Sequence, residues 1–263
     1  MKICLFTNAR DEKHIKEWIA HHLNLGFDHV YIFDHKSKVP IRSQVKPNNS
    51  ITIERIDYNR ELLKFHLMMK ARDIALNKYE WMLYLDADEF LIIDKDVHEF
   101  MEQYAKYNQV SFNWLVFGNN YLSHEPQGML MENYTRCSLY ASKLIKSFVR
   151  PPSIISVITP HVFNTKNMNL SISGITMKPL NEDGSAQYNI NKRYNQLTAY
   201  IAHYMYQSYD VYVSRKVNLP RDDKNEFRKE ITESELNEIA NDVINIDLRD
   251  KYVEVNKALI AEL

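Results

Sequence analysis

Two aspartates separated by one residue, Asp86 and Asp88, follow a short apolar segment, WMLYL at 81–85. The length and composition of that segment predict a buried strand. Where the chain turns off the strand, the two carboxylates can converge, and they then need a cation because like charges repel and buried charges are costly. Oxygen ligands suit Mg²⁺ or Mn²⁺, which keep positions open for water and phosphate oxygens. The alternative interpretation is a solvated acidic turn.

A histidine and a few basic residues could complete such a site. His203 is a polar residue within an apolar and aromatic segment, AYIAHYMY at 199–206, and a neutral imidazole ligates Mn²⁺. The alternative for His203 is a hydrogen-bonded structural histidine. Arg150 and Lys216 are the favoured candidates to contact an anionic leaving group, whereas most other basic residues are expected to form solvated edges.

Composition excludes several classes of function. The 263-residue chain has only five glycines, where about 7% is usual, and this excludes the glycine-rich loops that bind phosphate, both GxGxxG and the Walker type. With 33 Lys and Arg against 34 Asp and Glu, the net charge of −1 disfavours a nucleic-acid partner. Two cysteines are too few for a disulfide framework or a zinc cage.

Hydropathy along the chain gives an expectation about localisation. The sequence has no apolar run of about 18 residues, so we expect no membrane span. The apolar run at the N-terminus, ICLF, is too short for a signal peptide. We therefore expect a cytoplasmic protein.

The elements that must position the candidate residues follow from hydrophobic periodicity. Strands and helices are predicted in the order βαββαβ, at residues 2–7, 11–25, 29–33, 50–56, 59–78 and 81–85. This order favours an α/β fold with a mostly parallel sheet flanked by helices. Such sheets bind ligands beyond the carboxyl ends of their strands. Polar residues follow three of these strands, as Thr7 and Asn8, Asp34 and His35, and Asp86 and Asp88.

The second half of the chain is expected to complete the same domain. A helix is predicted after Asp94, ending near residue 106, and further strands at 109–117, 143–149 and 154–158. From residue 222 the sequence is charged and helical in pattern. We therefore expect one domain over 1–221, with a C-terminal helical extension of that domain over 222–263.

Taken in order, these segments resemble glycosyltransferase family 92 and the related family 2-like glycosyltransferases, which have the GT-A fold. The resemblance covers about residues 2–220, and LDADEF followed by a late HY…S…K segment is its specific part. It rests on the segments TNARDE, EWIAHHLNLGFDHV, YIFDHKS, WMLYLDADEFL, FNWLVFGNN, KSFVRP and IAHYMYQSYDVYVSRK. Where many relatives have KNE after the first strand, this chain has NARDE at 8–12.

The resemblance implies a Rossmann-like GT-A domain that uses a nucleotide-sugar. It implies that Asp86 and Asp88 form the DxD metal motif, that His203 reaches the same metal, and that the metal is Mn²⁺ or Mg²⁺. The residues implied to contact the nucleotide-sugar are Thr7, Asn8, Glu12, Asp34, Asp86 and Lys216. Because glycine loops are lacking, we expect the metal to neutralise the diphosphate and the nucleotide affinity to depend on it.

The implied reaction moves a sugar from a nucleotide-sugar, which the resemblance implies to be a UDP-sugar, to a hydroxyl of a glycan or glycoconjugate acceptor. The resemblance also implies inversion at the anomeric carbon. Inversion by one in-line displacement needs a carboxylate that accepts the acceptor's proton. Glu132, which follows the acceptor-side segment, is our candidate, and Glu125 and Asp183 are alternatives. Glu89 is a further alternative, although it is expected rather to orient the metal ligands.

Two other functions are weighed against this one. A metal-dependent phosphohydrolase is disfavoured, because its DxD usually follows the first strand and continues into Thr or Val. Here the DxD follows the fourth predicted strand and continues into Glu89 and Phe90. A non-catalytic module that binds nucleotide-sugars or carbohydrate would equally suit the supply of aromatic residues, 17 Tyr and 3 Trp.

Overall fold

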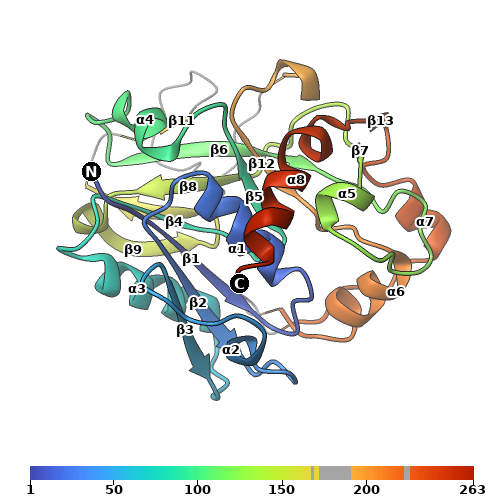
Figure 1. Ribbon diagram of the computed structural model, residues 1–263, viewed down its shortest axis with the longest axis horizontal. Coiled ribbons are helices and arrows are strands. Elements are labelled where there is room, and N and C mark those ends of the chain that lie inside the picture. Colours follow the sequence, from blue (N-terminus) through green and yellow to red (C-terminus); the bar gives the residue numbers. More distant parts are fainter. Residues whose placement is uncertain (167–168, 172–190, 222–225) are drawn as a thin grey trace.

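The computed structural model describes residues 1–166, 169–171, 191–221 and 226–263. One large sheet dominates the molecule (Figure 1), with the strand order β3-β2-β1-β4-β8-β6-β12-β5 and with β11 beside β6. Its strands are β1 (Ile3–Ala9), β2 (His29–His35), β3 (Ile51–Ile56), β4 (Trp81–Tyr84), β5 (Glu89–Ile92), β6 (Gln109–Val116), β8 (Ile145–Val149), β11 (Asn169–Ser171) and β12 (Tyr200–His203).

Most strand pairs of this sheet are parallel. The N-terminal half, from β3 to β4, pairs in parallel throughout, and β6 is parallel to both β11 and β12. Antiparallel pairs form where β8 lies between β4 and β6 and where β12 meets β5. Two small two-stranded sheets complete the strands, β9 (Ile154–Thr159) with β10 (Val162–Thr165) and β7 (Arg136–Cys137) with β13 (Val243–Ile244). The predicted α/β class is confirmed.

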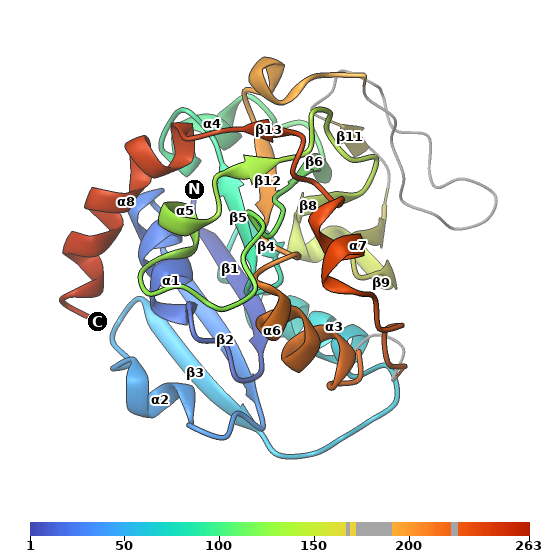
Figure 2. The same cartoon turned by 90° about the vertical axis from the view of Figure 1, so that its right-hand side faces the viewer.

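Helices cover both faces of the sheet (Figures 1 and 2). The longer ones are α1 (Ile15–Asn24), α3 (Leu63–Ala75) and α8 (Asp247–Ile260), and α1 packs against α8 on one face while α3 lies on the other. The short helices are α2 (Ile41–Gln44), α4 (Val97–Glu102), α5 (Leu130–Asn133), α6 (Tyr209–Tyr212) and α7 (Glu233–Asn237). Single turns of other helix types lie at Pro151–Ser153, Tyr194–Gln196 and Val213–Val217.

Strand β1 shows why the sheet needs both layers. Its side chains alternate between two hydrophobic cores, with Ile3 and Leu5 in the core under α1 and with Cys4 and Phe6 in the core under α3. All four are fully buried. A strand covered on both faces is apolar along its whole length, which explains why the chain begins with a continuous apolar run.

The helix predicted at 59–78 is shorter in the structure, since α3 spans Leu63–Ala75. The residue that precedes it, Leu62, has a left-handed backbone with φ 52° and ψ 38°. A non-glycine residue rarely adopts this conformation, and periodicity cannot reveal it. Similarly, α4 ends at Glu102, before the end predicted near residue 106.

The C-terminal extension predicted over 222–263 is bound to the body of the domain by strand pairing and by asparagine side chains. Asn241 donates from Nδ2 to Asn119 Oδ1 at 2.8 Å and accepts the Asn120 backbone N–H at 3.1 Å. Gly118 lies so close to this segment that a Cβ would come within 2.5 Å of the Ala240 carbonyl oxygen. The division into 1–221 and 222–263 stays a prediction.

Across the described part of the chain, the helices fall short of the length and apolar character that a membrane crossing requires.

Buried histidines should make stability depend on acid pH. Burial lowers the pKa of His21 to about 4 and the pKa of His22 well below its usual value, so both stay neutral in the folded chain while the unfolded chain takes up protons below about pH 6.5. The contribution of these two histidines to the free energy of unfolding is therefore complete above pH 6.5 and is lost as the pH falls toward 4. The loss is on the order of 3 kcal/mol for His21 alone.

Urea denaturation at a series of pH values between 4 and 7 measures this loss. In His21→Phe, which keeps an aromatic ring among Phe90 and Tyr252, the dependence of unfolding free energy on pH should be shallower by about one proton. Parallel curves for the two proteins would contradict the assignment.

Candidate active site

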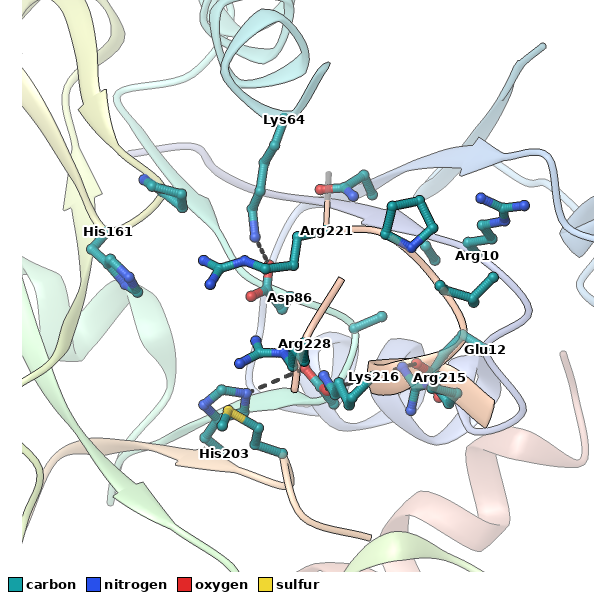
Figure 3. Close-up of a pocket in the computed structure, with 18 of the residues that line it drawn as sticks. Arg10, Glu12, Lys64, Asp86, His161, His203, Arg215, Lys216, Arg221 and Arg228 are labelled. Carbon is teal, nitrogen blue, oxygen red and sulfur yellow. Dashed lines mark hydrogen bonds and ion pairs between the residues drawn. The ribbon is translucent and has the colours of Figure 1, made fainter. Parts of the chain in front are cut away.

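A pocket of about 350 Å³ opens at the carboxyl ends of β1 and β4, where the sequence predicted a ligand site (Figure 3). Charged and aromatic side chains from distant parts of the chain form its wall. The polar and aromatic residues of the wall are Asn8, Arg10, Glu12, Lys64, Asp86, Asp88, Trp114, His161, His203, Arg215, Lys216, Arg221 and Arg228. Six of these are Lys or Arg and three are Asp or Glu, so the pocket favours an anionic ligand.

Six of the predicted site residues come together in this pocket: Asn8, Glu12, Asp86, Asp88, His203 and Lys216. Two others lie beside it. Thr7 is buried in β1, and its hydroxyl contacts the Asn8 carbonyl oxygen at 3.4 Å. Asp34 is the second-last residue of β2 and accepts hydrogen bonds from the backbone of Ser37 and Ile41 and from Arg55, so it orders the loop that follows β2.

Two lysines compensate the charge of Asp86. Lys64 from α3 pairs with Oδ1, and the Lys146 Nζ from β8 lies 3.5 Å from Oδ2. Burial by itself would raise the pKa of Asp86, but the two ammonium groups outweigh it and lower that pKa. Asp86 is therefore ionised at neutral pH, the form in which a carboxylate can bind a metal ion.

Asp88 is nearly inaccessible to solvent and faces three nitrogen-bearing side chains. Its Oδ2 lies 2.6 Å from Lys216 Nζ and 4.0 Å from an Arg215 Nη2, and its Oδ1 lies 3.5 Å from His203 Nε2. Burial opposes ionisation, but Lys216 and His203 lower the pKa of Asp88 well below its usual value. Arg215 also pairs with the buried Glu12.

Glu89 connects the DxD turn to the histidine from beneath the pocket. Its Oε2 accepts the Asp86 backbone N–H at 2.8 Å and lies 3.2 Å from Lys146 Nζ. Its Oε1 lies 3.8 Å from His203 Nδ1, and these two buried atoms have no hydrogen-bond partner. Glu89 is fully buried. Its contacts with Asp86 and His203 suit the predicted role of orienting the metal ligands.

The ligand atoms that the pocket wall offers are of the kinds that bind a hard divalent cation. Asp86 and Asp88 offer carboxylate oxygens and His203 offers Nε2, which are ligands of Mn²⁺ and Mg²⁺. Their negative charge is balanced in the structure by ammonium groups. Among residues 1–166, 169–171, 191–221 and 226–263, no three His, Cys, Asp or Glu side chains are gathered as a metal cage.

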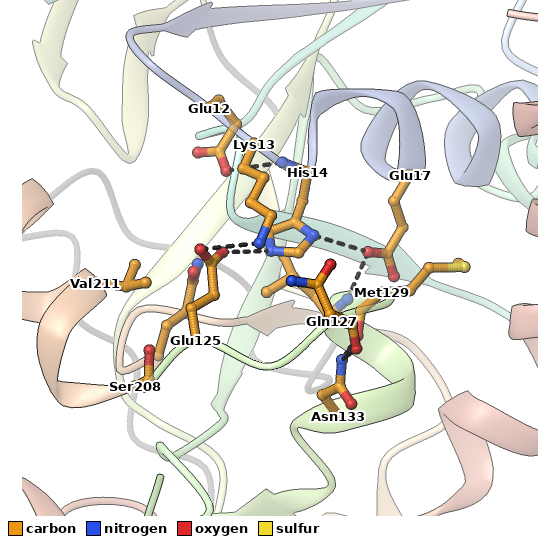
Figure 4. Close-up of polar contacts among 12 residues, drawn as sticks. Glu12, Lys13, His14, Glu17, Glu125, Gln127, Met129, Asn133, Ser208 and Val211 are labelled. Carbon is orange, nitrogen blue, oxygen red and sulfur yellow. Dashed lines mark hydrogen bonds and ion pairs between the residues drawn. The ribbon is translucent and has the colours of Figure 1, made fainter. Parts of the chain in front are cut away.

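Two of the carboxylates considered as proton acceptors, Glu132 and Glu125, lie outside the pocket wall. Glu132 is on α5, where it contacts Lys257 Nζ of α8 at 3.2 Å, outside the pocket wall. Glu125 lies in the loop before α5 and contacts Lys13 Nζ at 2.9 Å and His14 Nε2 at 3.2 Å (Figure 4). Asp183 lies outside the described residues, and the choice of the base stays a prediction.

The loop with Glu125 is fastened to the start of α1. Glu17 of α1 accepts the backbone N–H groups of Leu130 at 2.6 Å and Met131 at 3.0 Å, and its Oε2 lies 3.8 Å from His14 Nδ1. Burial raises the pKa of Glu17 to about 7. These contacts fix the segment from residue 125 to residue 131 relative to the start of α1, and thereby relative to the pocket (Figure 4).

Sequence reasoning missed Lys64 and favoured Arg150 over Lys146. In the structure Arg150 donates to the carbonyl oxygens of Tyr107 and Ala105 and stacks on Trp81, away from the pocket. Lys146 is the buried cation instead. A lysine within the mostly apolar segment 144–149 was the signal that could have identified it, because a lysine is almost never fully buried without a partner.

Comparison with known proteins identifies the family. The profile of glycosyltransferase family 92 matches residues 68–246, which is more than half of the chain and includes the DxD turn and the segment with His203. The chain belongs to glycosyltransferase family 92. This confirms the resemblance predicted from the sequence.

Two curated family 92 proteins match part of the chain. One from Oryza sativa subsp. japonica is 26% identical over 183 residues, 62% of this chain and 30% of its own length. One from Ricinus communis is 23% identical over 175 residues, 60% of this chain and 30% of its own length. The chain thus matches less than a third of the length of each of these two family 92 relatives.

Among solved structures, this family 92 chain is similar to HddC from Yersinia pseudotuberculosis complexed with GMP-PN. The TM-score is 0.40 and the identity 9%, and the match covers 77% of this chain and 93% of that one.

Replacing Lys146 tests the charge balance under the pocket. Lys146→Met keeps the volume of the stem but removes the ammonium between Asp86 and Glu89, and breaking a buried pair of this kind costs about 3–5 kcal/mol. Urea denaturation measures the loss. The exposed Lys143→Met, three residues earlier, serves as the matched control and should change stability by less than about 0.5 kcal/mol.

The double variant Lys146→Met/Glu89→Gln should recover part of the lost stability, because it removes the charge left uncompensated. Equal destabilisation by the single and the double variant would contradict the pairing.

Proposed function

We propose that this family 92 domain is a metal-dependent glycosyltransferase that moves a sugar from a UDP-sugar to a hydroxyl of a glycan or glycoconjugate, with inversion. The observation that carries the proposal is the pocket itself. At the carboxyl ends of parallel strands, it gathers the DxD carboxylates, His203 and an excess of basic side chains. An anionic leaving group and a cation that binds carboxylates are the ligands that suit such a wall.

The basic residues of the wall are proposed to bind the diphosphate. Arg215 and Lys216 follow α6 and approach from the side of Asp88, and Arg221 and Arg228 enter from the segment that continues toward α7 (Figure 3). A guanidinium binds phosphate oxygens in bidentate fashion. These side chains would hold the leaving group in place and stabilise the negative charge that it gains.

Asp86, Asp88 and His203 are proposed to hold Mn²⁺ or Mg²⁺. When bound, such an ion supplies Lewis-acid stabilisation to the departing diphosphate. Glu89 fixes the backbone of Asp86 through its hydrogen bond and faces His203 Nδ1. The edge-on contact of Trp114 with the His203 ring, 4.3 Å between centroids, further restricts the orientation of the imidazole.

The nucleoside is proposed to lie toward the loops after β1 and β2. Asn8 and Arg10 line the pocket on this side, and Asp34 orders the adjoining loop through the backbone of Ser37 and Ile41.

The proton acceptor is proposed to be Glu132, as the sequence suggested. Because a general base must come within hydrogen-bond reach of the acceptor hydroxyl, Glu132→Gln, Glu125→Gln and Asp183→Asn should be compared for kcat at saturating acceptor.

Release of nucleoside diphosphate tests the proposed function directly. With Mn²⁺ and a panel of UDP- and GDP-sugars, we expect UDP release from a UDP-sugar and none in excess chelator. Asp86→Asn and Asp88→Asn should reduce the rate at least about 100-fold, because a metal ion contributes several kcal/mol to the transition state.

Asp73→Asn is the matched control, since Asp73 is an exposed residue of α3 that contacts Arg72. Full activity in chelator would contradict metal dependence, and release of GDP alone would contradict the UDP donor. Binding of nucleotide-sugars without release from any donor or acceptor would indicate a non-catalytic module.

A further inference from the structure

Acidic and basic groups around the DxD turn balance one another. The carboxylates of Glu12, Asp86, Asp88 and Glu89 contact four cationic side chains, which belong to Lys64, Lys146, Arg215 and Lys216. As all four carboxylates and all four cations lie within one contiguous cluster, their formal charges cancel. A divalent ion that entered alone would therefore give the cluster an excess of two positive charges, which is unfavourable at a partly buried site.

The two lysines on Asp86 differ in their position relative to the pocket. Lys146 is 1% exposed and is held by Asp86, by Glu89 and by the Pro160 carbonyl oxygen at 3.1 Å. Lys64 extends from the first turn of α3, on the opposite side, and its ammonium reaches Asp86 Oδ1 within the pocket wall (Figure 3). Lys64 thus lines the pocket that a ligand would enter, whereas Lys146 contacts Asp86 from outside the pocket wall.

The backbone before Lys64 supports a functional role for this contact. Leu62 is 47% exposed and left-handed, with φ 52°, a conformation that is strained for a non-glycine residue. It fixes where the first turn of α3 begins, and therefore where Lys64 enters the pocket. Strained backbone of this kind is concentrated at functional sites.

We propose that Lys64 occupies the place of the divalent cation at Asp86, and that ion binding displaces its ammonium toward the diphosphate. The inference rests on the metal dependence proposed above and adds a role for Lys64. Two cations cannot share one carboxylate oxygen without repulsion. The ion alone therefore binds weakly, whereas an ion accompanied by a diphosphate binds well, since the phosphates bring negative charge that both the ion and Lys64 can contact.

Binding of Mn²⁺ alone, followed by the electron paramagnetic resonance of free Mn²⁺, tests this competition without any turnover. Lys64→Met keeps the stem and removes the charge. A neighbouring charge shifts the proton affinity of a carboxylate by about 10- to 1000-fold, so Lys64→Met should bind Mn²⁺ at least about tenfold more tightly than the wild type. UDP should then improve Mn²⁺ binding less in Lys64→Met than in the wild type, because the effects of the two ligands on one another are reciprocal.

Two further variants separate charge from shape. Lys64→Arg keeps the positive charge and should retain the weak Mn²⁺ binding of the wild type. Lys70→Met removes a lysine from the same helix that pairs with Glu54, away from the pocket, and should leave Mn²⁺ binding unchanged. Thermal unfolding of each variant verifies that it is folded.

The results distinguish this inference from the proposed function. Mn²⁺ binding that is unchanged or weaker in Lys64→Met, in a wild type whose UDP release needs Mn²⁺, overturns the role of Lys64 alone. A wild type that binds no Mn²⁺ with or without UDP, and that releases UDP in chelator, overturns metal dependence and this inference together. Equal tightening of Mn²⁺ binding by Lys64→Met and Lys70→Met would also overturn it, because the effect would then not be local to Asp86.

Discussion

Compensation of the charge on the partly buried Asp86 and the buried Asp88 is the constraint on which the site depends. Two carboxylates at the end of a buried strand are stable only if cations reach them from elsewhere in the chain. These cations come from α3, from β8 and from the turn at 213–217. The pocket can therefore form only when three segments that are far apart in sequence have packed around the same strand end.

Strand register brings the histidine to the same place. In the antiparallel pair of β5 and β12, His203 lies opposite Glu89, and on its other side β12 runs parallel to β6 with His203 opposite Val116. A shift of one residue would turn His203 to the other face of the sheet. The proximity of His203 to Asp88 is thus a consequence of sheet pairing, and Glu89, directly opposite, is placed by the same register to face its Nδ1.

The position of the segment that carries Glu125 and Glu132 depends on the C-terminal extension. Asn241 holds the backbone and side chain of the segment 119–120, and α8 packs on α1 and α5. Gly118 permits the close approach of this segment. Although its sequence showed no functional motif, the extension orders the loop that carries Glu125 and the helix that carries Glu132.

The sequence by itself determined the α/β class and the DxD turn at a strand end, because these depend on local periodicity and on residue types of restricted chemistry. The resemblance to family 92 implied that His203 and Lys216 belong to the same site. The scarcity of glycine in the sequence also excluded the glycine-rich loops that bind phosphate. Only the tertiary structure decided that Lys64 and Lys146 neutralise Asp86, that Arg150 lies elsewhere, and that Glu132 contacts Lys257. A lysine or arginine stem spans several ångströms in many directions, so the carboxylate it reaches depends on how helices and strands pack, which no local pattern encodes.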